Sequence, residues 1–458
     1  MNTRAAIGAL AASALLIGVS ACSDDTSDTT APPKVSENRG HTAVNDTLVA
    51  LVRQLTAGRG ITPMPRTPHV RPALVRLGQA LAFDKVLSGN HDISCMSCHL
   101  PGFATGDGRS LSIGQGGTGL GPDRVHPDGA FIPRNSPAVF NITTVNPLFW
   151  DGRVSSDGNG GFHTPAGAHL SRKMMKTFEF GAISAQPLFP VLSREEMRGQ
   201  RGNELARIAD DQEPRIWAGL MTRLGKIRRY RQLFEAAYPG ERFETMTFAH
   251  ASNAIAGFLI SELAFNDSPW DRFLAGDDRA LTSKQLLGAK DFMSAKCSVC
   301  HNGPALTDNK FHNVAVAQIG PGKGGAAGHD DFGRMEITGN PADKYAFRTP
   351  PLRNVELTAP YGHDGAITTL KGFVDHYSES DLKLRAYKKH QLEPLLRGTV
   401  QPTTDGILAT RDTLLDGVVF PEETIVEVTE FMRALTDPAA RNLRRLAPRT
   451  VPSGLPID

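Results

Sequence analysis

The sequence predicts a mainly α-helical protein made of two related domains, with long loops and few strands. Seven stretches have apolar residues at helical spacing or strong helix formers: residues 45–57, 71–85, 204–237, 248–265, 282–296, 368–377 and 421–436. In one of them Phe248, Ala251 and Ile255 recur at intervals of three or four, which is the period of one helical face. Two long segments rich in Gly and Pro lie between them, at 101–137 and 302–346. Loops of that length are uncommon in compact domains, so we expect a large bound group to organise them.

The second half of the chain repeats the first. The pattern Cys-x-x-Cys-His occurs at residues 95–99 and again at 297–301. Matching residues flank both copies in the same order: Leu77-Gly78 and Leu287-Gly288, Arg134-Asn135-Ser136-Pro137 and Arg348-Thr349-Pro350, Asn141 and Asn354, Trp150-Asp151-Gly152 and His363-Asp364-Gly365. So many matches in one order are not expected by chance, so the sequence indicates two copies of one module.

Composition excludes several classes of protein. The 458 residues include 50 basic and 48 acidic side chains, and 40% are apolar. This apolar fraction can form real cores and excludes a wholly disordered chain. The balanced charge argues against a nucleic-acid binder, and five cysteines in this length do not make a disulfide scaffold.

The N-terminus predicts export to the periplasm and a lipid anchor. Arg4 precedes an apolar run over residues 5–19, which has the length of a signal peptide rather than of a membrane span. The run ends in Val19-Ser20-Ala21-Cys22, which resembles a bacterial lipobox with Cys22 as the lipidated residue. An ordinary signal with a chance cysteine is the alternative. We divide the chain into a signal (1–22), a flexible tether (23–60), two domains (61–270 and 271–440) and a tail (441–458).

Each Cys-x-x-Cys-His motif is typical of covalent attachment of a c-type haem. Cys95 and Cys98 can bond the two vinyl groups of one porphyrin, and His99 can bind the iron. The second copy offers the same set, which is Cys297, Cys300 and His301. A zinc site that paired the two motifs would leave both histidines without a role, and a thioredoxin-like pair would need a βαβ context. The sequence therefore predicts two covalently bound c haems.

Three further motifs resemble those of the bacterial dihaem cytochrome c peroxidase/MauG family. They are Phe149-Trp150-Asp151-Gly152-Arg153, Phe347-Arg348-Thr349-Pro350-Pro351-Leu352-Arg353-Asn354-Val355 and Leu357-Thr358-Ala359-Pro360-Tyr361-Gly362-His363-Asp364-Gly365. The resemblance extends from about residue 70 to the C-terminus. It implies two cytochrome c-like helical domains with one haem each and a calcium site between them. The first haem would react with hydrogen peroxide, and the second would pass electrons to it.

The resemblance also implies catalytic residues beside the first haem. Gln186, Pro190 and Glu196 match the residues that the family places on the open face of the iron, and Glu196 would move a proton between the peroxide oxygens. Many members have a distal histidine where this sequence has Gln115, so we expect an open iron position without reductive activation. His126, in the following loop, is the alternative ligand.

The second haem's other axial ligand would define the subtype. Where typical peroxidases have a methionine, this sequence has Tyr377, as in MauG-like members. An anionic oxygen ligand favours ferric iron. His376 and, more remotely, Met335 are the alternatives.

Two more functions follow from the resemblance. Trp150 matches the tryptophan that lies between the haems, where it would relay electrons; simple core packing is the alternative. The remaining matches, to residues that supply oxygen ligands to calcium, are Asn135, Thr358 and Pro360.

The sequence thus predicts a periplasmic, lipid-anchored, MauG-like dihaem peroxidase. It would reduce hydrogen peroxide to water with electrons from an exported small cytochrome c or cupredoxin. Two alternatives stay open: an oxidase that acts through a bis-ferryl state on aromatic side chains of a partner protein, and a dihaem electron-transfer cytochrome without catalysis.

Overall fold

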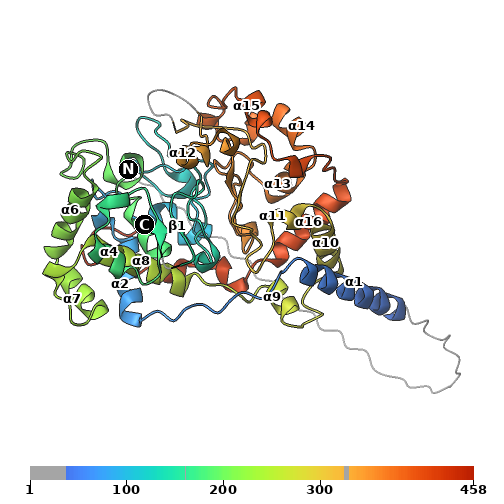
Figure 1. The fold of residues 1–458 in the computed structure, drawn as a ribbon, viewed down its shortest axis with the longest axis horizontal. Coiled ribbons are helices and arrows are strands. Elements are labelled where there is room, and N and C mark those ends of the chain that lie inside the picture. The colour runs from blue at the N-terminus through green and yellow to red at the C-terminus, as the bar shows by residue number, and fades with distance from the viewer. Residues whose placement is uncertain (1–37, 160, 324–329) are drawn as a thin grey trace, which may run out of the picture. The chain divides into compact units, whose positions relative to one another are not determined.

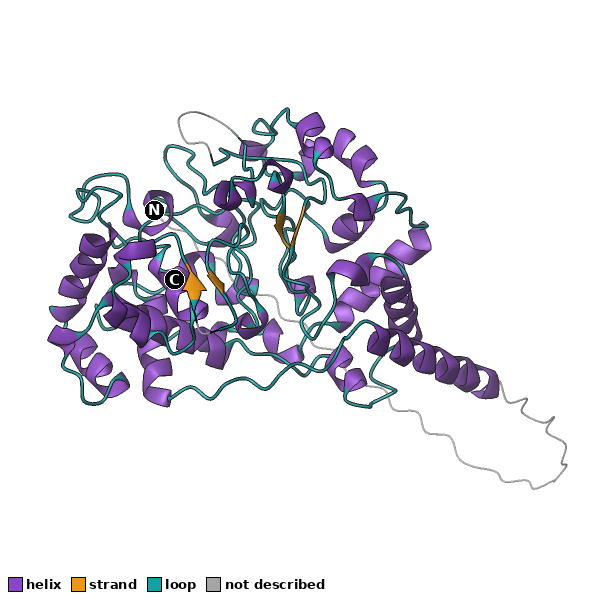
Figure 2. Cartoon of the chain, in the orientation of Figure 1, coloured by secondary structure: helices purple, strands orange, loops and turns teal. Residues whose placement is uncertain are grey.

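A computed structural model of the chain describes residues 38–159, 161–323 and 330–458. Residues 45–458 form one compact unit, and the following concerns that unit. Helices and loops make up nearly all of it (Figure 2), with two antiparallel strand pairs: β1 (Ser155–Ser156) with β2 (Phe162–His163), and β3 (Phe311–His312) with β4 (Phe347–Arg348). The predicted mainly α class is therefore confirmed.

The predicted signal sequence and its Cys22 lie outside the described residues. Within the described part of the chain, none of the helices combines the length and apolarity needed to cross a bilayer.

Among the described residues, the first module contains four α-helices of ten or more residues and three short ones. Its helices are α2 (Pro72–Phe83), α3 (Cys95–Cys98), α4 (Arg172–Thr177), α5 (Ala182–Ala185), α6 (Glu213–Gly225), α7 (Arg228–Ala237) and α8 (Phe248–Glu262). Pro72 occupies the first turn of α2, where no backbone N–H is needed, and Thr247 caps α8. The predicted helix 204–237 is shorter and is broken after Gly225, because the chain leaves the helical conformation at Ile227 before α7 begins.

The second module repeats this pattern, and the helices of each module cluster together in Figure 1. Its helices are α9 (Pro269–Leu274), α10 (Ser283–Ser294), α11 (Cys297–Cys300), α12 (Met335–Thr338), α13 (Leu370–His376), α14 (Ser380–Arg385), α15 (Thr404–Ala409) and α16 (Glu422–Ala434). Thr282 and Gln285 form a capping box at the start of α10, as is typical of a helix N-terminus.

The predicted duplication appears as the same helix crossing in both modules. α2 packs on α8 in the first module, and α10 packs on α16 in the second. A Cβ on Gly78 would lie 1.9 Å from the carbonyl oxygen of Ala254, and one on Gly288 would lie 1.9 Å from that of Glu427. Both glycines are therefore required because the helix backbones approach too closely for a side chain.

The repeated asparagines also have matching roles. Asn141 and Asn354 both have positive φ, 48° and 64°, which asparagine tolerates better than most residues. The Asn141 side chain accepts from the backbone N–H of Phe265, just after α8, at 2.8 Å. The Asn354 side chain accepts from that of Asp437, just after α16, at 2.9 Å. Each asparagine thus connects the haem loop of its module to the end of the second helix of the crossing.

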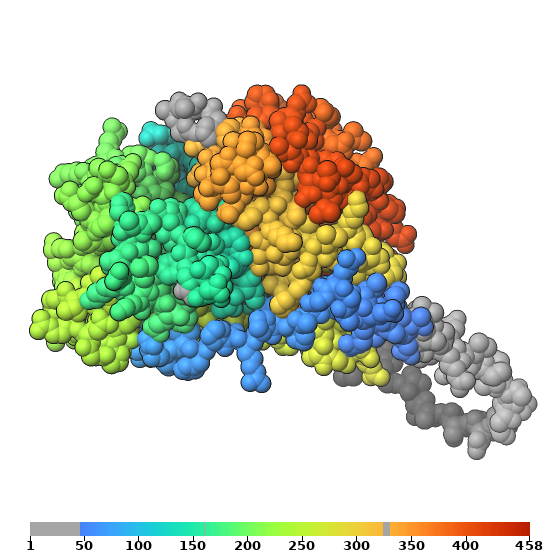
Figure 3. Space-filling model, viewed as in Figure 1, coloured from blue at the N-terminus to red at the C-terminus, as the bar shows by residue number. Residues whose placement is uncertain are grey.

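Part of the predicted tether is a packed helix. α1 spans Asn38–Gly58, and Val49, Val52 and Ile61 are buried in the core of the second module. Figure 3 shows this blue segment against the yellow atoms of that module. The reason is the apolar spacing of α1, whose burial removes hydrocarbon from water. The expectation of a flexible tether up to residue 60 is therefore wrong for residues 46–60.

The predicted tail is likewise part of a core. Leu443, Leu446 and Val451 are buried in the first module. The Ser453 hydroxyl donates to the buried Asp84 carboxylate at 2.6 Å. The last residues therefore return from the second module to the first, where the label C lies in Figure 1.

Candidate functional site: two haem-attachment centres

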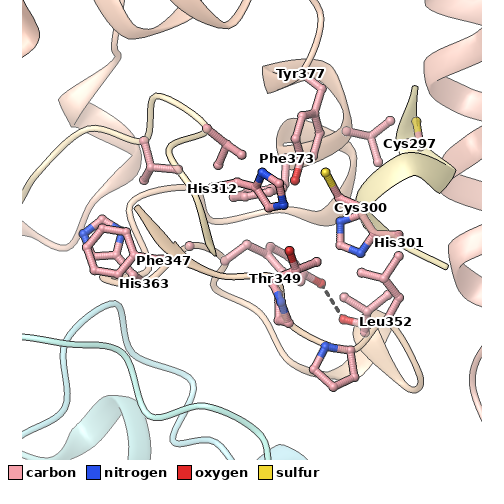
Figure 4. Close-up of a pocket in the computed structure, with 18 of the residues that line it drawn as sticks. Cys297, Cys300, His301, His312, Phe347, Thr349, Leu352, His363, Phe373 and Tyr377 are labelled. Carbon is pink, nitrogen blue, oxygen red and sulfur yellow. Dashed lines mark hydrogen bonds between the residues drawn. The ribbon is translucent and has the colours of Figure 1, made fainter. Parts of the chain in front are cut away.

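The second haem motif lines a large cavity. α11 carries Cys297 and Cys300, and His301 follows at its end. All three side chains line the cavity, which Figure 4 shows together with Tyr377, whose hydroxyl lies beside Cys300. Most of the other lining is apolar and includes Phe292, Val314, Leu352, Phe373 and Val428. An apolar cavity with two thiols and an imidazole at one side suits a flat, hydrophobic ring.

Both proximal histidines are held in the tautomer that metal binding needs. His99 Nδ1 lies 2.9 Å from the carbonyl oxygen of Thr105, and His301 Nδ1 lies 3.0 Å from that of Leu306. A carbonyl accepts only from an N–H, so each Nε2 is left with a lone pair for iron. Burial lowers the pKa of both rings, that of His301 to about 4, so both are neutral near pH 7.

The donor set fits attached haem and does not fit a shared zinc ion. Among the described residues, only one group of three ligand side chains lies close together: Cys300, Asp308 and His312. The cysteines of the first motif are not part of it, and they pack in the separate core of the first module. The zinc alternative that pairs the two motifs therefore has no basis in this fold.

Tyr377 and His376 point to different sides of α13. Tyr377 lines the cavity, and burial, together with the nearby thiols Cys300 and Cys297, raises the pKa of its hydroxyl. His376 Nε2 lies 2.7 Å from the carbonyl oxygen of Val314. Neither His376 nor Met335 lines the cavity. Of the three alternatives, Tyr377 alone therefore faces the haem motif.

Glu196 lies near the first haem motif. It belongs to one turn of π-helix, Arg194–Arg198, whose start is capped by the Ser193 hydroxyl. Burial raises the pKa of the Glu196 carboxyl, whereas the neighbouring Glu195 is exposed. Burial, and to a smaller extent the charge of Glu196, raises the pKa of the Cys95 thiol to about 12. A carboxyl that resists ionisation beside this motif can both donate and accept a proton.

Gln115 lies beside the same turn. Its backbone N–H donates to the carbonyl oxygen of Glu196 at 3.0 Å, so the segment that contains Gln115 borders Glu196. His126 is close by but is held by its own loop, because its Nδ1 accepts from the backbone N–H of Asp128 at 3.0 Å. This contact places the ring proton of a neutral His126 on Nε2, which must lose it before it can bind iron.

Gln186 and Pro190 are half-buried in the first module. Phe189 between them packs edge-to-face on Phe149, with ring centroids 6.3 Å apart. Among the described residues, no group forms a hydrogen bond with the Gln186 side chain. Phe189 belongs to the hydrophobic core of the first module, against which Cys95 and Cys98 also pack.

Trp150 and the candidate calcium ligands lie where the modules meet. Trp150 is buried, and its Nε1–H donates to the carbonyl oxygen of Asn135 at 3.0 Å. Asn135, Thr358 and Pro360 line the same cavity as Trp150 and His301. The Asn135 side-chain amide donates to the carbonyl oxygen of Arg109 at 2.8 Å, and none of the described residues donates to its side-chain oxygen. The structure therefore brings these four residues together with the second haem motif.

Two residues of the cavity have roles that the sequence did not reveal. His312 is held between Asp412 (2.5 Å) and Asp308 (3.1 Å), and contacts with Asp308, Cys300 and Asp412 raise the pKa of its ring to about 11. Arg348 is buried at the same wall. The available signals for Arg348 were its match to Arg134 in the repeat and its place in a motif of the resemblance, and no pattern identified His312.

The chain is similar to known dihaem peroxidases. The family model described as di-haem cytochrome c peroxidase matches residues 72–279. Cytochrome c551 peroxidase of Pseudomonas aeruginosa is 32% identical over 298 residues, covering 65% of this chain and 69% of that protein. Methylamine utilization protein MauG of Methylorubrum extorquens is 28% identical over 316 residues, covering 69% and 71%.

Solved structures give the same result. A MauG-like protein associated with microbial copper homeostasis superposes with a TM-score of 0.58 at 26% identity, covering 84% of this chain and 96% of that one. The diheme peroxidase BthA of Burkholderia thailandensis, at 19% identity and a TM-score of 0.58, shares the fold. The chain thus belongs to the dihaem cytochrome c peroxidase/MauG family, whose members are peroxidase-type oxidoreductases with two c haems.

Proposed function

We propose that the protein reduces hydrogen peroxide to water at the haem held by His99, with electrons delivered through the second haem. Glu196 carries this proposal, because its half-buried carboxyl has a raised pKa and lies near the first motif. When bound, the haem supplies the iron at which the O–O bond is split. Glu196 takes the proton from the inner peroxide oxygen and returns it to the outer one, so that water leaves. Gln186 orients the peroxide with its free amide, and Pro190 keeps water from this face.

Electron supply completes the proposed cycle. An exported small cytochrome c or cupredoxin delivers electrons to the second haem, held by His301 and Tyr377, and Trp150 relays them to the first. Trp150 supports this role because its indole is fixed by Asn135 at the wall of the second cavity. A calcium ion bound by Asn135, Thr358 and Pro360 would hold the two modules together. The enzyme acts in the periplasm, anchored through lipid on Cys22.

Glu196→Gln tests the catalytic step. We expect peroxide turnover with reduced small cytochrome c to fall by ~10²- to 10⁴-fold, because the amide cannot exchange a proton. Glu195→Gln is the matched control, since its side chain is exposed next to the same turn, and it should keep nearly full activity. Equal turnover of Glu196→Gln and wild type would overturn the proton-transfer role.

A second candidate function is oxidation of aromatic side chains of a partner protein, as the MauG-like subtype implies. The orientation of Tyr377 into the cavity favours it, because an anionic oxygen ligand stabilises oxidised iron. Low-temperature electron paramagnetic resonance of the oxidised protein tests the ligand. Tyr377→Met should change the electron paramagnetic resonance signal of the second haem, whereas His376→Gln should leave that signal unchanged. The same spectrum should show a high-spin first haem, since an all-low-spin spectrum would indicate an electron-transfer cytochrome.

A further inference from the structure

Arg348 is a buried cation without a buried anion. Its side chain is 5% exposed, and among the described residues no carboxylate pairs with it. Nε donates to the carbonyl oxygen of Phe149 at 3.2 Å, and Nη1 donates to that of Thr349 at 3.0 Å. The described residues offer no partner to Nη2. Burial lowers the pKa of the guanidinium to about 10, so it stays charged near pH 7.

Other buried arginines of the protein have their charge or their donors satisfied. Arg134 pairs with Asp151 and Asp331, and Arg353 pairs with Asp271 at 2.8 Å. Arg124 has no carboxylate, but all its nitrogens donate to carbonyl oxygens. Arg348 differs because it lacks a counter-charge and keeps one unsatisfied nitrogen.

The environment of Arg348 indicates which kind of group can neutralise its charge. A buried, unpaired charge is strongly unfavourable, and carbonyl contacts offset only part of that cost. Arg348 lines the same cavity as Cys297 and His301, and its neighbour Thr349 accepts a hydrogen bond from Thr307 at 2.7 Å. An anion entering this cavity would therefore reach Nη2 without displacing any contact within the protein.

We propose that Arg348 binds a propionate carboxylate of the second haem. The propionates are the anionic groups of a haem attached through its vinyl groups, and a guanidinium binds a carboxylate through parallel N–H donors. Arg348 thereby positions the porphyrin opposite its thioether bonds and raises the potential of its iron, because a nearby positive charge favours the reduced state. The proposal rests on the second haem occupying this cavity, which the haem content of the purified protein tests separately.

The test is the reduction of each haem in wild type, Arg348→Gln and Arg348→Lys, measured by spectroelectrochemical titration of the holoprotein. For Arg348→Gln we expect the oxidised-to-reduced ratio of the second haem at fixed potential to rise at least tenfold, equivalent to about 59 mV. Arg348→Lys keeps the charge and should shift the ratio by no more than about threefold. The ratio of the first haem should stay within twofold, as an internal control. An unchanged second haem, or equal shifts at both haems, would overturn the proposal.

A direct readout covers the case in which Arg348→Gln does not fold. The propionate-bending band of the second haem in resonance Raman spectra should move in Arg348→Lys, because a compact ammonium cannot reproduce the hydrogen-bond geometry of the planar guanidinium. Arg353→Lys is the matched control, since Arg353 lies on the same wall and already has Asp271; its band should not move. A band that stays fixed in Arg348→Lys, together with a wild-type potential that responds saturably to added formate, would assign the site to a free anion instead.

Discussion

The two copies of the repeat bury the same arginine and aspartate in opposite ways. In the first module Arg134 Nη1 lies 2.6 Å from the Asp151 carboxylate, and Asp331 of the second module adds an ion pair at 2.5 Å. In the second module the equivalent residues, Arg348 and Asp364, are equally buried. Among the described residues, neither has a partner of opposite charge. The fold was therefore duplicated, whereas its charge pairing was not.

The aspartates show what this difference does. In both copies one carboxylate oxygen accepts from the N–H two residues on, Arg153 at 3.1 Å and Ala366 at 3.1 Å. Despite its burial, Asp151 has a pKa well below its usual range because Arg134 and Arg153 are close. Burial without such neighbours raises the pKa of Asp364 to about 8. Near pH 7 the aspartate of this turn is therefore ionised in the first module and protonated in the second.

The largest expected effect on stability comes from removing the arginine that forms the ion pairs of the first module. Arg134→Gln should lower the free energy of unfolding by about 3–5 kcal/mol, because it leaves Asp151 and Asp331 buried with less compensation. Chemical denaturation of the holoprotein near pH 7 measures it. Arg134→Lys is the control: it keeps the positive charge and should lower the free energy of unfolding by less than Arg134→Gln does. A change below 1 kcal/mol for Arg134→Gln would show that the pair is not what distinguishes the first copy.

The helix crossing, in contrast, should respond equally in both copies. Gly78→Ala and Gly288→Ala each place a methyl group against a backbone carbonyl, and overpacking of this kind costs about 1–3 kcal/mol. Chemical denaturation of the two variants should give losses of unfolding free energy that agree within about 0.5 kcal/mol. Gly398→Ala is the control, since a Cβ there meets no atom within 4 Å. Unequal losses would mean that the modules differ in their packing as well as in their charges.

Local signals made the helices and the haem motifs predictable. The spacing of Cys297, Cys300 and His301 alone specifies a chemistry, and the apolar period of α8 specifies its helix. Contacts between distant residues were not predictable. Arg134 gains its second carboxylate from Asp331, which lies 197 positions away in the sequence, and nothing near Arg348 in the sequence shows that it gains none.

The error at the C-terminal end comes from burial that no local pattern in the sequence shows. Residues 441–458 have neither helical nor strand periodicity, so their sequence is that of a tail. Leu443 and Leu446 are nevertheless buried, because the first module offers an apolar surface that only the folded chain presents. Such burial depends on the partner surface and not on a local pattern, and sequence reasoning therefore assigned the segment to no domain.

The sharpest test of the unpaired copy is Asp364→Asn, because its effect on stability depends on pH. The pKa of the Asp364 carboxyl is near 8 in the folded protein and near 3.9 in the unfolded chain. Between pH 4 and pH 8 the folded protein therefore keeps a proton on Asp364 that the unfolded chain has released. The free energy of unfolding must therefore fall in wild type as pH rises from about 4 to 8, by at most ~1.4 kcal/mol per pH unit. The amide removes this contribution, so Asp364→Asn should match wild type near pH 4 and exceed it increasingly towards pH 8.

Denaturation series at several pH values measure this difference. Asp151→Asn is the control with the opposite sign, because a carboxylate with a lowered pKa stabilises the fold at neutral pH and loses that contribution only in acid. If the curves of wild type and Asp364→Asn ran parallel from pH 4 to 8, Asp364 would be ionised throughout. The second copy would then need a cation beside this carboxylate, and the contrast between the modules would rest on Arg348 alone.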